Sequence, residues 1–358
     1  MKRKCDSRGP RSELNMRHAS SCYSCWRIAG LLVALIGLGT PANAQAPRYS
    51  VTDLGTLGGG TSKGYGINAS GRVTGEAVTG GGVFHAFLYT PGSGMTDLGT
   101  LGGGSSTGYA INASGQVTGV AVTANGALRA FLYTPGNGLT DLGTLGGGES
   151  KGYGINASGQ VTGEVPSGGF LFTPGSGMTD LGTLGGGSST GYAINASGQV
   201  TGQEVTANGA LHAFLYTPGR GMTDLGTLGG GTSNGYAINA SGQVTGQAVK
   251  TGGAFHAFLY TPGSGMTDLG TLGGGSSTGY AINASGQVTG EAVTPGGALH
   301  AFLYAKRAMR DLNSMIDPAI AAQVTLFSGK GINDDGWIVA NGVDSRTGVT
   351  HAYLLSKH

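Results

Sequence analysis

The chain is built from copies of one segment of about 44 residues. The triplet Asp-Leu-Gly recurs at intervals of 44, 44, 39, 44 and 44 residues, beginning at Asp53, Asp97, Asp141, Asp180, Asp224 and Asp268. A weaker seventh copy, Asp311-Leu312-Asn313, follows 43 residues after the sixth. The segments Ile-Asn and His-Ala-Phe-Leu-Tyr recur in step with this triplet. A fixed period of this length predicts one supersecondary unit used seven times, because such units bury their apolar faces only against their neighbours.

Each unit contains four short runs that are rich in β-branched and aromatic residues. The runs are Tyr-Ala-Ile-Asn, Gln-Val-Thr-Gly-x-Ala-Val, His-Ala-Phe-Leu-Tyr-Thr and Met-Thr-Asp-Leu-Gly-Thr-Leu. Asn-Ala-Ser-Gly links the first two and Thr-Pro-Gly-Ser-Gly links the last two; Gly and Asn allow the positive φ angles of tight hairpins. The units lack helical periodicity, and only residues 305–323 could hold a short helix. These features predict an all-β fold.

Four strands in a unit of about 44 residues match the size of a β-propeller blade. Residues 48–55 have the pattern of a fourth strand, whereas the last unit ends at residues 351–355 on a third strand. We therefore predict a seven-bladed β-propeller of four-stranded blades, closed by the N-terminal strand. Closure removes the open sheet edges at which repeat arrays aggregate. A β-solenoid is the alternative, since 44 residues also equal two coils of about 22 residues.

The first 44 residues have the pattern of a secretory signal peptide. A basic region with seven Lys or Arg precedes the apolar run 28–39, and Thr-Pro-Ala-Asn-Ala follows it. The run is too short to cross a bilayer easily, and cleavage is expected after Ala44. Translation could start at Met1 or Met16. We predict a product that is secreted or periplasmic, with residues 45–358 as a single repeat domain and no stable transmembrane segment after cleavage.

Removal of this segment changes the charge and the cysteine content. Lys plus Arg falls from 20 to 13 and Asp plus Glu from 18 to 16, so the net charge changes from +2 to about −3. Nucleic-acid binding then has no basic surface to support it. All three cysteines, Cys5, Cys22 and Cys25, lie in the removed segment. The mature chain therefore has no disulfide, and packing must stabilise it. We expect a monomer.

The repeated DLGTLGG, GYAINASGQVTG and HAFLY segments resemble the extracellular HAF-repeat family, which is named for its His-Ala-Phe motif. The resemblance covers nearly all of residues 49–355. It implies a secreted or surface-exposed bacterial protein without an assigned molecular function. The seventh unit departs most from the pattern, with Asp311-Leu-Asn, Lys330-Gly-Ile-Asn and Trp337-Ile-Val-Ala-Asn.

The repeated polar residues favour structural roles. One His per unit, at 85, 212, 256, 300 and 351, is spread around any ring, whereas a metal ion needs ligands that converge. We predict a hydrogen bond within the blade, to the repeated Asp or to a backbone carbonyl, and Asx turns at that Asp. Near-identical blades also do not supply the asymmetric cluster that catalysis needs. The sequence thus predicts no enzyme, cofactor or metal site.

Variation between units indicates where a partner could bind. The Asn-Ala-Ser-Gly and Thr-Pro-Gly turns should share one face, which is nearly identical in every unit. The second-to-third and fourth-to-first loops should share the other face, where most of the variation lies. Binding residues often lie on loops of a rigid scaffold. The predicted binding residues on this variable face are Lys63, Arg129, Glu149, Lys151, Asn234 and Lys250.

These features favour an exported binding scaffold as the function. Its partner would be a polysaccharide, a cell-envelope component or a surface protein. Two alternatives stay open: a secreted propeller enzyme that acts on glycans, and a purely structural surface repeat. A hydrolase would need a pair of carboxylates a few ångströms apart.

Overall fold

The computed structural model describes residues 48–358, which cluster as one compact unit. The predicted signal peptide, with its cleavage site after Ala44, lies outside the described residues. No helix within residues 48–358 is both long and apolar enough to cross a membrane.

Residues 48–358 form seven antiparallel sheets of four strands each, one per blade. Blade 1 has β2 (Gly58–Ile67), β3 (Val73–Thr79), β4 (Phe84–Thr90) and β5 (Gly94–Asp97). Blade 2 has β6 (Gly102–Ile111), β7 (Val117–Thr123), β8 (Leu128–Thr134) and β9 (Gly138–Asp141). Blade 3 has β10 (Lys151–Ile155), β11 (Val161–Val165), β12 (Gly168–Thr173) and β13 (Gly177–Asp180). Blade 4 has β14 (Gly185–Ile194), β15 (Val200–Thr206), β16 (Leu211–Thr217) and β17 (Gly221–Asp224).

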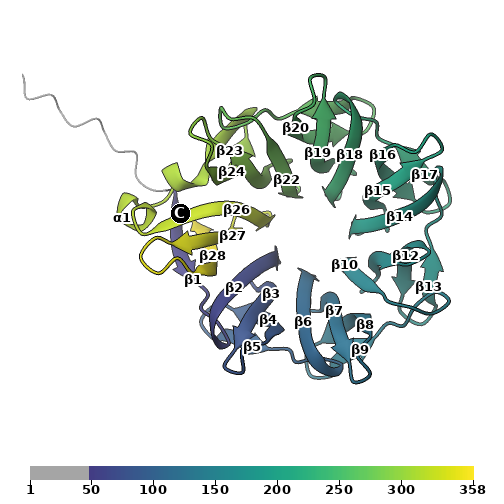
Figure 1. Ribbon diagram of the computed structural model, residues 1–358, viewed down its shortest axis with the longest axis horizontal. Helices are drawn as coiled ribbons and strands as arrows, with labels where there is room; N and C mark the ends of the chain where they lie inside the picture. Colours follow the sequence, from purple (N-terminus) through teal and green to yellow (C-terminus); the bar gives the residue numbers. More distant parts are fainter. Residues whose placement is uncertain (1–47) are drawn as a thin grey trace, which may run out of the picture. The chain divides into compact units, whose positions relative to one another are not determined.

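The remaining blades follow the same order. Blade 5 has β18 (Gly229–Ile238), β19 (Val244–Lys250), β20 (Phe255–Thr261) and β21 (Gly265–Asp268). Blade 6 has β22 (Ser277–Ile282), β23 (Val288–Val293), β24 (Leu299–Ala305) and β25 (Ala308–Asp311). Blade 7 has β26 (Val324–Ile332), β27 (Ile338–Asp344), β28 (Thr350–Lys357) and β1 (Tyr49–Asp53). The first strand of each blade lies nearest the centre of the ring (Figure 1).

The N-terminal strand closes the ring. Strand β1 pairs with β28 in the order β1-β28-β27-β26, with Val51 opposite Leu355. His351 on β28 contacts Asp53 on β1 at 2.7 Å, the same His–Asp contact that other blades make within one continuous segment. The prediction of seven four-stranded blades closed by the N-terminal strand is confirmed, and the solenoid alternative is wrong.

The segment predicted to hold a short helix contains several elements. After β25, a 3-10 turn spans Leu312–Ser314 and helix α1 spans Pro318–Ala321. Asp317 caps α1, because its carboxylate accepts the Ala319 N–H at 2.7 Å. The prediction of a short helix within residues 305–323 is confirmed, although a β-strand occupies part of that range.

The core lies between successive blades. Each of the first six blades buries one phenylalanine completely, at Phe87, Phe131, Phe170, Phe214, Phe258 and Phe302. The residue opposite it on the neighbouring strand is glycine, as in the Gly119–Phe131 pair. A Cβ atom on Gly119 would lie 1.9 Å from the Thr107 carbonyl oxygen and 2.9 Å from the Phe131 ring. Only glycine fits at this position, so packing requires this repeated glycine.

A closed cycle of asparagine side chains joins the seven blades. Each side-chain Nδ2 donates to the backbone carbonyl of the next asparagine, from Asn68 to Asn112 at 3.1 Å and onward to Asn333. The last bond returns from Asn333 to the Asn68 carbonyl at 3.2 Å. The same asparagines cap their own hairpins: the Oδ1 of Asn68 accepts the Ser70 and Arg72 N–H groups. One repeated residue therefore forms both the turn and the junction between blades.

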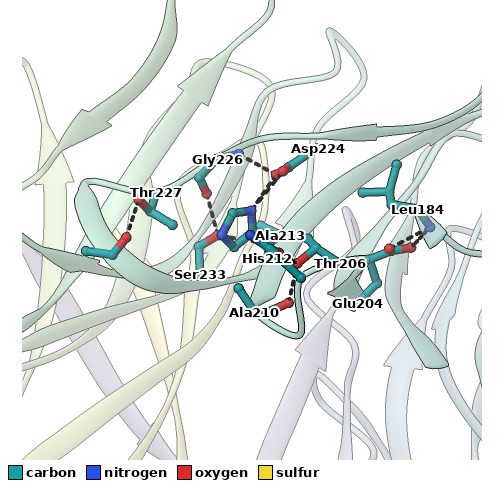
Figure 2. A network of polar contacts seen from close by, with 12 residues as sticks. Leu184, Glu204, Thr206, Ala210, His212, Ala213, Asp224, Gly226, Thr227 and Ser233 are labelled. Carbon is teal, nitrogen blue, oxygen red and sulfur yellow. Dashed lines mark hydrogen bonds and ion pairs between the residues drawn. The ribbon is translucent and has the colours of Figure 1, made fainter. Parts of the chain in front are cut away.

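The repeated His and Asp form the network predicted from the sequence. In blade 4, His212 Nδ1 lies 2.8 Å from Asp224 Oδ2, and the Gly226 N–H donates to the Asp224 carboxylate (Figure 2). Ser233 of blade 5 accepts the Ala213 N–H and donates to the Gly226 carbonyl, which ties the two blades together. Equivalent His–Asp pairs are His85–Asp97, His256–Asp268, His300–Asp311 and His351–Asp53. The predicted bond within the blade and the Asx turn are both confirmed.

In the same region, one buried carboxylate replaces a repeated alanine of the second strands. Glu204 is 1% exposed and stands where β3, β7, β19 and β23 carry alanine. Its two oxygens accept the Leu184 N–H at 2.6 and 2.7 Å (Figure 2). Burial raises the pKa of Glu204, and the backbone donor offsets only part of that effect. Glu204 thus anchors the connection that enters blade 4, directly after the shortened blade 3.

Candidate binding site

A collar of tyrosines lines the centre of the ring. The innermost strands alternate their side chains, so the residue two positions before each repeated Ile faces the same way in every blade. Neighbouring ring centroids are 5.3 to 5.8 Å apart, and the tyrosines are Tyr65, Tyr109, Tyr153, Tyr192, Tyr236 and Tyr280. In blade 7, Lys330 occupies this position. Lys330 and all of these tyrosines except Tyr280 border a cavity of about 260 Å³, which we call the central cavity.

A polar cluster joins the collar to the second strands. In blade 1, Glu76 accepts from Lys63 at 3.3 Å, from the Tyr65 hydroxyl at 2.9 Å and from Thr107 of blade 2 at 3.0 Å. Blade 3 repeats this cluster around Glu164, which accepts from Lys151 and Tyr153 at 2.9 Å and from Thr190 of blade 4 at 3.3 Å.

The protonation states of these groups follow from their surroundings. Burial and the neighbouring Glu164 raise the pKa of Tyr153, and burial and Glu76 do the same for Tyr65. Burial acts to raise the pKa of Glu164 as well, but hydrogen bonds from Lys151, Tyr153 and Thr190 outweigh it and hold this pKa below its usual range. The phenols therefore stay neutral donors while the Glu164 carboxylate stays charged.

A five-residue deletion opens a notch beside the blade 3 cluster. Strand β11 ends at Val165, whereas the matching strand of blade 2 extends to Thr123 and pairs there with Gly102. The triple-glycine segment of blade 3 has no such partner, and β10 begins only at Lys151. The resulting cavity has a volume of about 330 Å³, and its lining includes Glu149, Lys151, Glu164, Pro166, Ser188 and Thr190.

The structure brings some of the predicted binding residues together. Glu149 and Lys151 both line the notch. Arg129 lies at its edge, because its guanidinium donates to the Gly148 carbonyl and sits 3.9 Å from Asp141. Lys250 lies two blades away in blade 5, where it bonds Asp268 at 3.2 Å.

Five of the six predicted residues occupy strands instead of loops, and only Glu149 lies in a loop. Arg129 is in β8 and Lys250 ends β19. Lys63, Lys151 and Asn234 share one position on the innermost strands β2, β10 and β18. The sequence placed them in the fourth-to-first loops because the preceding glycines have the composition of a loop. In blades 1 and 5 these glycines instead extend the strand, since Gly58 pairs with Thr79 and Gly229 pairs with Lys250.

Sequence reasoning missed the tyrosine collar, Glu76 and Lys330. The tyrosine recurs in each of the first six units, two residues before the repeated Ile. This spacing indicates that the two side chains lie on the same face of one strand. Lys330 was visible as the one departure at this position. Among residues 48–358, no group of three or more His, Cys, Asp or Glu side chains is arranged to hold a metal ion.

Comparisons with known proteins do not assign the chain to a family. No family model matches the chain, so membership of the HAF-repeat family stays a prediction. No curated protein matches it either.

Solved structures resemble the chain only remotely. A lectin from Burkholderia pseudomallei is 13% identical, with 86% of this chain and 98% of that chain covered and a TM-score of 0.39. A gluconolactonase from Xanthomonas campestris is 9% identical, with 89% and 97% covered and a TM-score of 0.43. TolB from Acinetobacter baumannii is 12% identical, with 76% of each chain covered and a TM-score of 0.41. Likeness at this level carries no conclusion about a ligand.

Proposed function

We propose that this protein is an exported binding scaffold that recognises a polysaccharide at the notch of blade 3. The observation that carries the proposal is the notch itself, a cavity of about 330 Å³ at the point where the repeat is broken. It places a charged donor and a charged acceptor, Lys151 and Glu164, beside serine and threonine hydroxyls. The predicted signal peptide supports export.

The lining of the notch suits sugar hydroxyls. Each hydroxyl donates one hydrogen bond and accepts others, so a sugar site needs both kinds of partner close together. Glu164 supplies acceptor oxygens, whereas Lys151 supplies donors. Lys151 and Glu164 already bond each other at 2.9 Å, which holds both side chains in place before a ligand arrives. Preorganisation of this kind lowers the entropic cost of binding.

Binding suits this site better than glycan hydrolysis. A glycosidase needs a carboxylic acid with a raised pKa as its proton donor. The pKa of Glu164 is lowered by its hydrogen bonds, so this group holds no proton to give at neutral pH. The other notch carboxylate, Glu149, belongs to the glycine loop before β10. If the protein were a purely structural surface repeat, the notch would bind no ligand.

A glycan array probed with the purified full chain tests the proposal. We expect selective binding to one class of polysaccharide. The double variant K151A/E164A should lose at least about tenfold in affinity, because it removes both charged partners. A second variant restores the five missing residues between β11 and β12 from the sequence of blade 1. It should also lose binding, since the longer hairpin fills the notch while Lys151 and Glu164 remain.

The control is R346A, which removes an 82% exposed arginine from the matching second-to-third loop of blade 7. It should bind as the unaltered protein does. Retained binding in both notch variants would contradict the proposal, and so would the absence of binding to every glycan tested.

A further inference from the structure

Lys330 interrupts an otherwise uniform collar. Its position on β26 matches that of Tyr280 on β22, and Gly331-Ile332-Asn333 follows it as Ala281-Ile282-Asn283 follows the tyrosine. The lysine borders the central cavity of about 260 Å³, together with the tyrosines of blades 1 to 5. A positive charge therefore replaces a neutral phenol at one point of the wall.

The immediate partners of Lys330 leave its charge only loosely compensated. Its Nζ lies 3.2 Å from the centroid of the Tyr280 ring, a cation–π contact. The nearest carboxylate oxygen, on Glu291, is 4.0 Å away, and the Tyr280 hydroxyl already donates to this carboxylate at 2.8 Å. Lysines in the other clusters lie closer to their carboxylates, at 3.3 Å for Lys63 and 2.9 Å for Lys151.

Blade 7 also lacks the carboxylate that blades 1, 3 and 6 carry on their second strands. Asn341 stands at that position on β27. Its amide is used on the backbone of Gly64, accepting the N–H at 2.8 Å and donating to the carbonyl at 3.2 Å. Strand β27 therefore supplies no carboxylate to Lys330 and Lys63, and the Glu76 carboxylate of blade 1 bonds Lys63.

Burial and the neighbouring charged groups set the pKa of Lys330. Burial is the main cause that lowers the pKa of Lys330 to about 8, while Glu291 acts to raise it and Lys63 acts to lower it. An anion beside Nζ would compensate the charge that burial disfavours. The remaining group packed against the lysine, Tyr280, stays neutral because burial and Glu291 raise its pKa.

We propose that the central cavity binds a small organic carboxylate, with Lys330 as its charged partner. The cavity has room for a six-carbon acid, and the tyrosine collar offers apolar edges to the rest of the molecule. A monoanion suits the site better than a dianion, because Glu291 and Glu76 lie near the two lysines. This site is separate from the notch and does not depend on the polysaccharide proposal.

Affinity for the carboxylate should depend on pH with a defined sign. Protonated Lys330 attracts the carboxylate and the neutral amine does not, so affinity should fall as pH rises through about 8. Binding should raise the pKa of Lys330 and draw a proton from solution. Titrations at pH 8 in buffers of different ionisation enthalpy measure that proton directly.

The test is isothermal titration calorimetry of the full chain with D-glucuronate, D-glucose and inorganic phosphate. Glucuronate should bind at least about tenfold more tightly than glucose, which lacks the charge, and phosphate should be the weaker anion at pH 7.5. K330M should weaken glucuronate binding at least about tenfold and remove the fall near pH 8. K330Y restores the residue of the other six blades, so it should fold and likewise lose glucuronate binding.

R346M, which removes an exposed charge that does not line the cavity, should bind glucuronate as the unaltered protein does. Three results would overturn the proposal: unchanged glucuronate affinity in K330M and K330Y, equal affinity for glucose, or no binding of glucuronate to the folded protein. Stronger binding of phosphate than of glucuronate would assign the site to inorganic oxyanions and would overturn the carboxylate assignment.

Discussion

At the scale of single residues, the repeated positions perform several tasks at once. Asn68 forms a hairpin turn and also bonds the next blade, while Ser106 bridges two blades through one hydroxyl. The sequence predicted turn roles for the asparagines. It could not assign the bond to the next blade, because that partner lies 44 residues away in the chain.

Replacement of Gly119 by alanine should destabilise the protein strongly. The new Cβ would lie 1.9 Å from the Thr107 carbonyl oxygen and would force β6 and β7 apart. We expect a loss of roughly 2–4 kcal/mol in the free energy of unfolding, which is typical of overpacked interiors. Chemical denaturation followed by circular dichroism measures it.

Gly104→Ala is the matched control in the same blade. A Cβ added at Gly104 would meet no atom within 4 Å, and this glycine has no positive φ. Its replacement should change the free energy of unfolding by less than about 0.5 kcal/mol. Equal losses in G119A and G104A would mean that the tight contact is not what selects glycine.

At the scale of elements, all four strands of a blade were predicted, but the extension of the first strand through the glycine segment in blades 1, 2, 4 and 5 was not. Gly-Gly-Gly has little intrinsic tendency to form a strand, so its composition indicated a loop. Pairing with the second strand decides the outcome: Gly102 is in β6 because Thr123 is there to pair with it. This dependence explains why β2 and β18 begin at Gly58 and Gly229, whereas β10 begins only at Lys151.

Blade 3 provides an internal test of that dependence. Its triple glycine, 146–148, has positive φ throughout and precedes β10, whereas in blade 2 the segment 102–104 begins β6. We expect backbone amides of 146–148 to exchange with solvent at least about tenfold faster than those of 102–104, because paired strands open less often. Hydrogen–deuterium exchange with mass spectrometry compares the two peptides in one sample.

The variant with the restored hairpin should slow exchange in 146–148 toward the rate of 102–104. Equal rates in the unaltered protein would show that the shortened hairpin does not free the glycines, and the account of the notch would then be wrong.

At the scale of the whole molecule, closure of the ring sets the positions of the blades and thus of the two proposed sites. The seven-blade architecture followed from the period and from the two chain ends, since a missing fourth strand and a spare one complement each other. The central cavity did not follow, because it needs the positions of side chains from all seven innermost strands at once. The two sites that we propose lie at departures from the repeat, the deletion in blade 3 and Lys330 in blade 7.

Closure by the N-terminal strand is the central claim, and a cysteine cross-link tests it most directly. Val51 on β1 faces Leu355 on β28, and opposite residues of antiparallel strands lie within the Cα distance range of disulfides. Residues 48–358 contain no cysteine. Under mild oxidation, V51C/L355C should form a disulfide identified by peptide mapping, with a raised thermal midpoint because a loop of about 300 residues is closed.

The register control is V51C/L354C, whose side chains point to opposite faces of the sheet and should not cross-link. A disulfide in V51C/L355C alone is the result that closure in this register predicts. Failure of V51C/L355C to cross-link in the folded protein, or equal cross-linking of both pairs, would contradict a ring closed by β1.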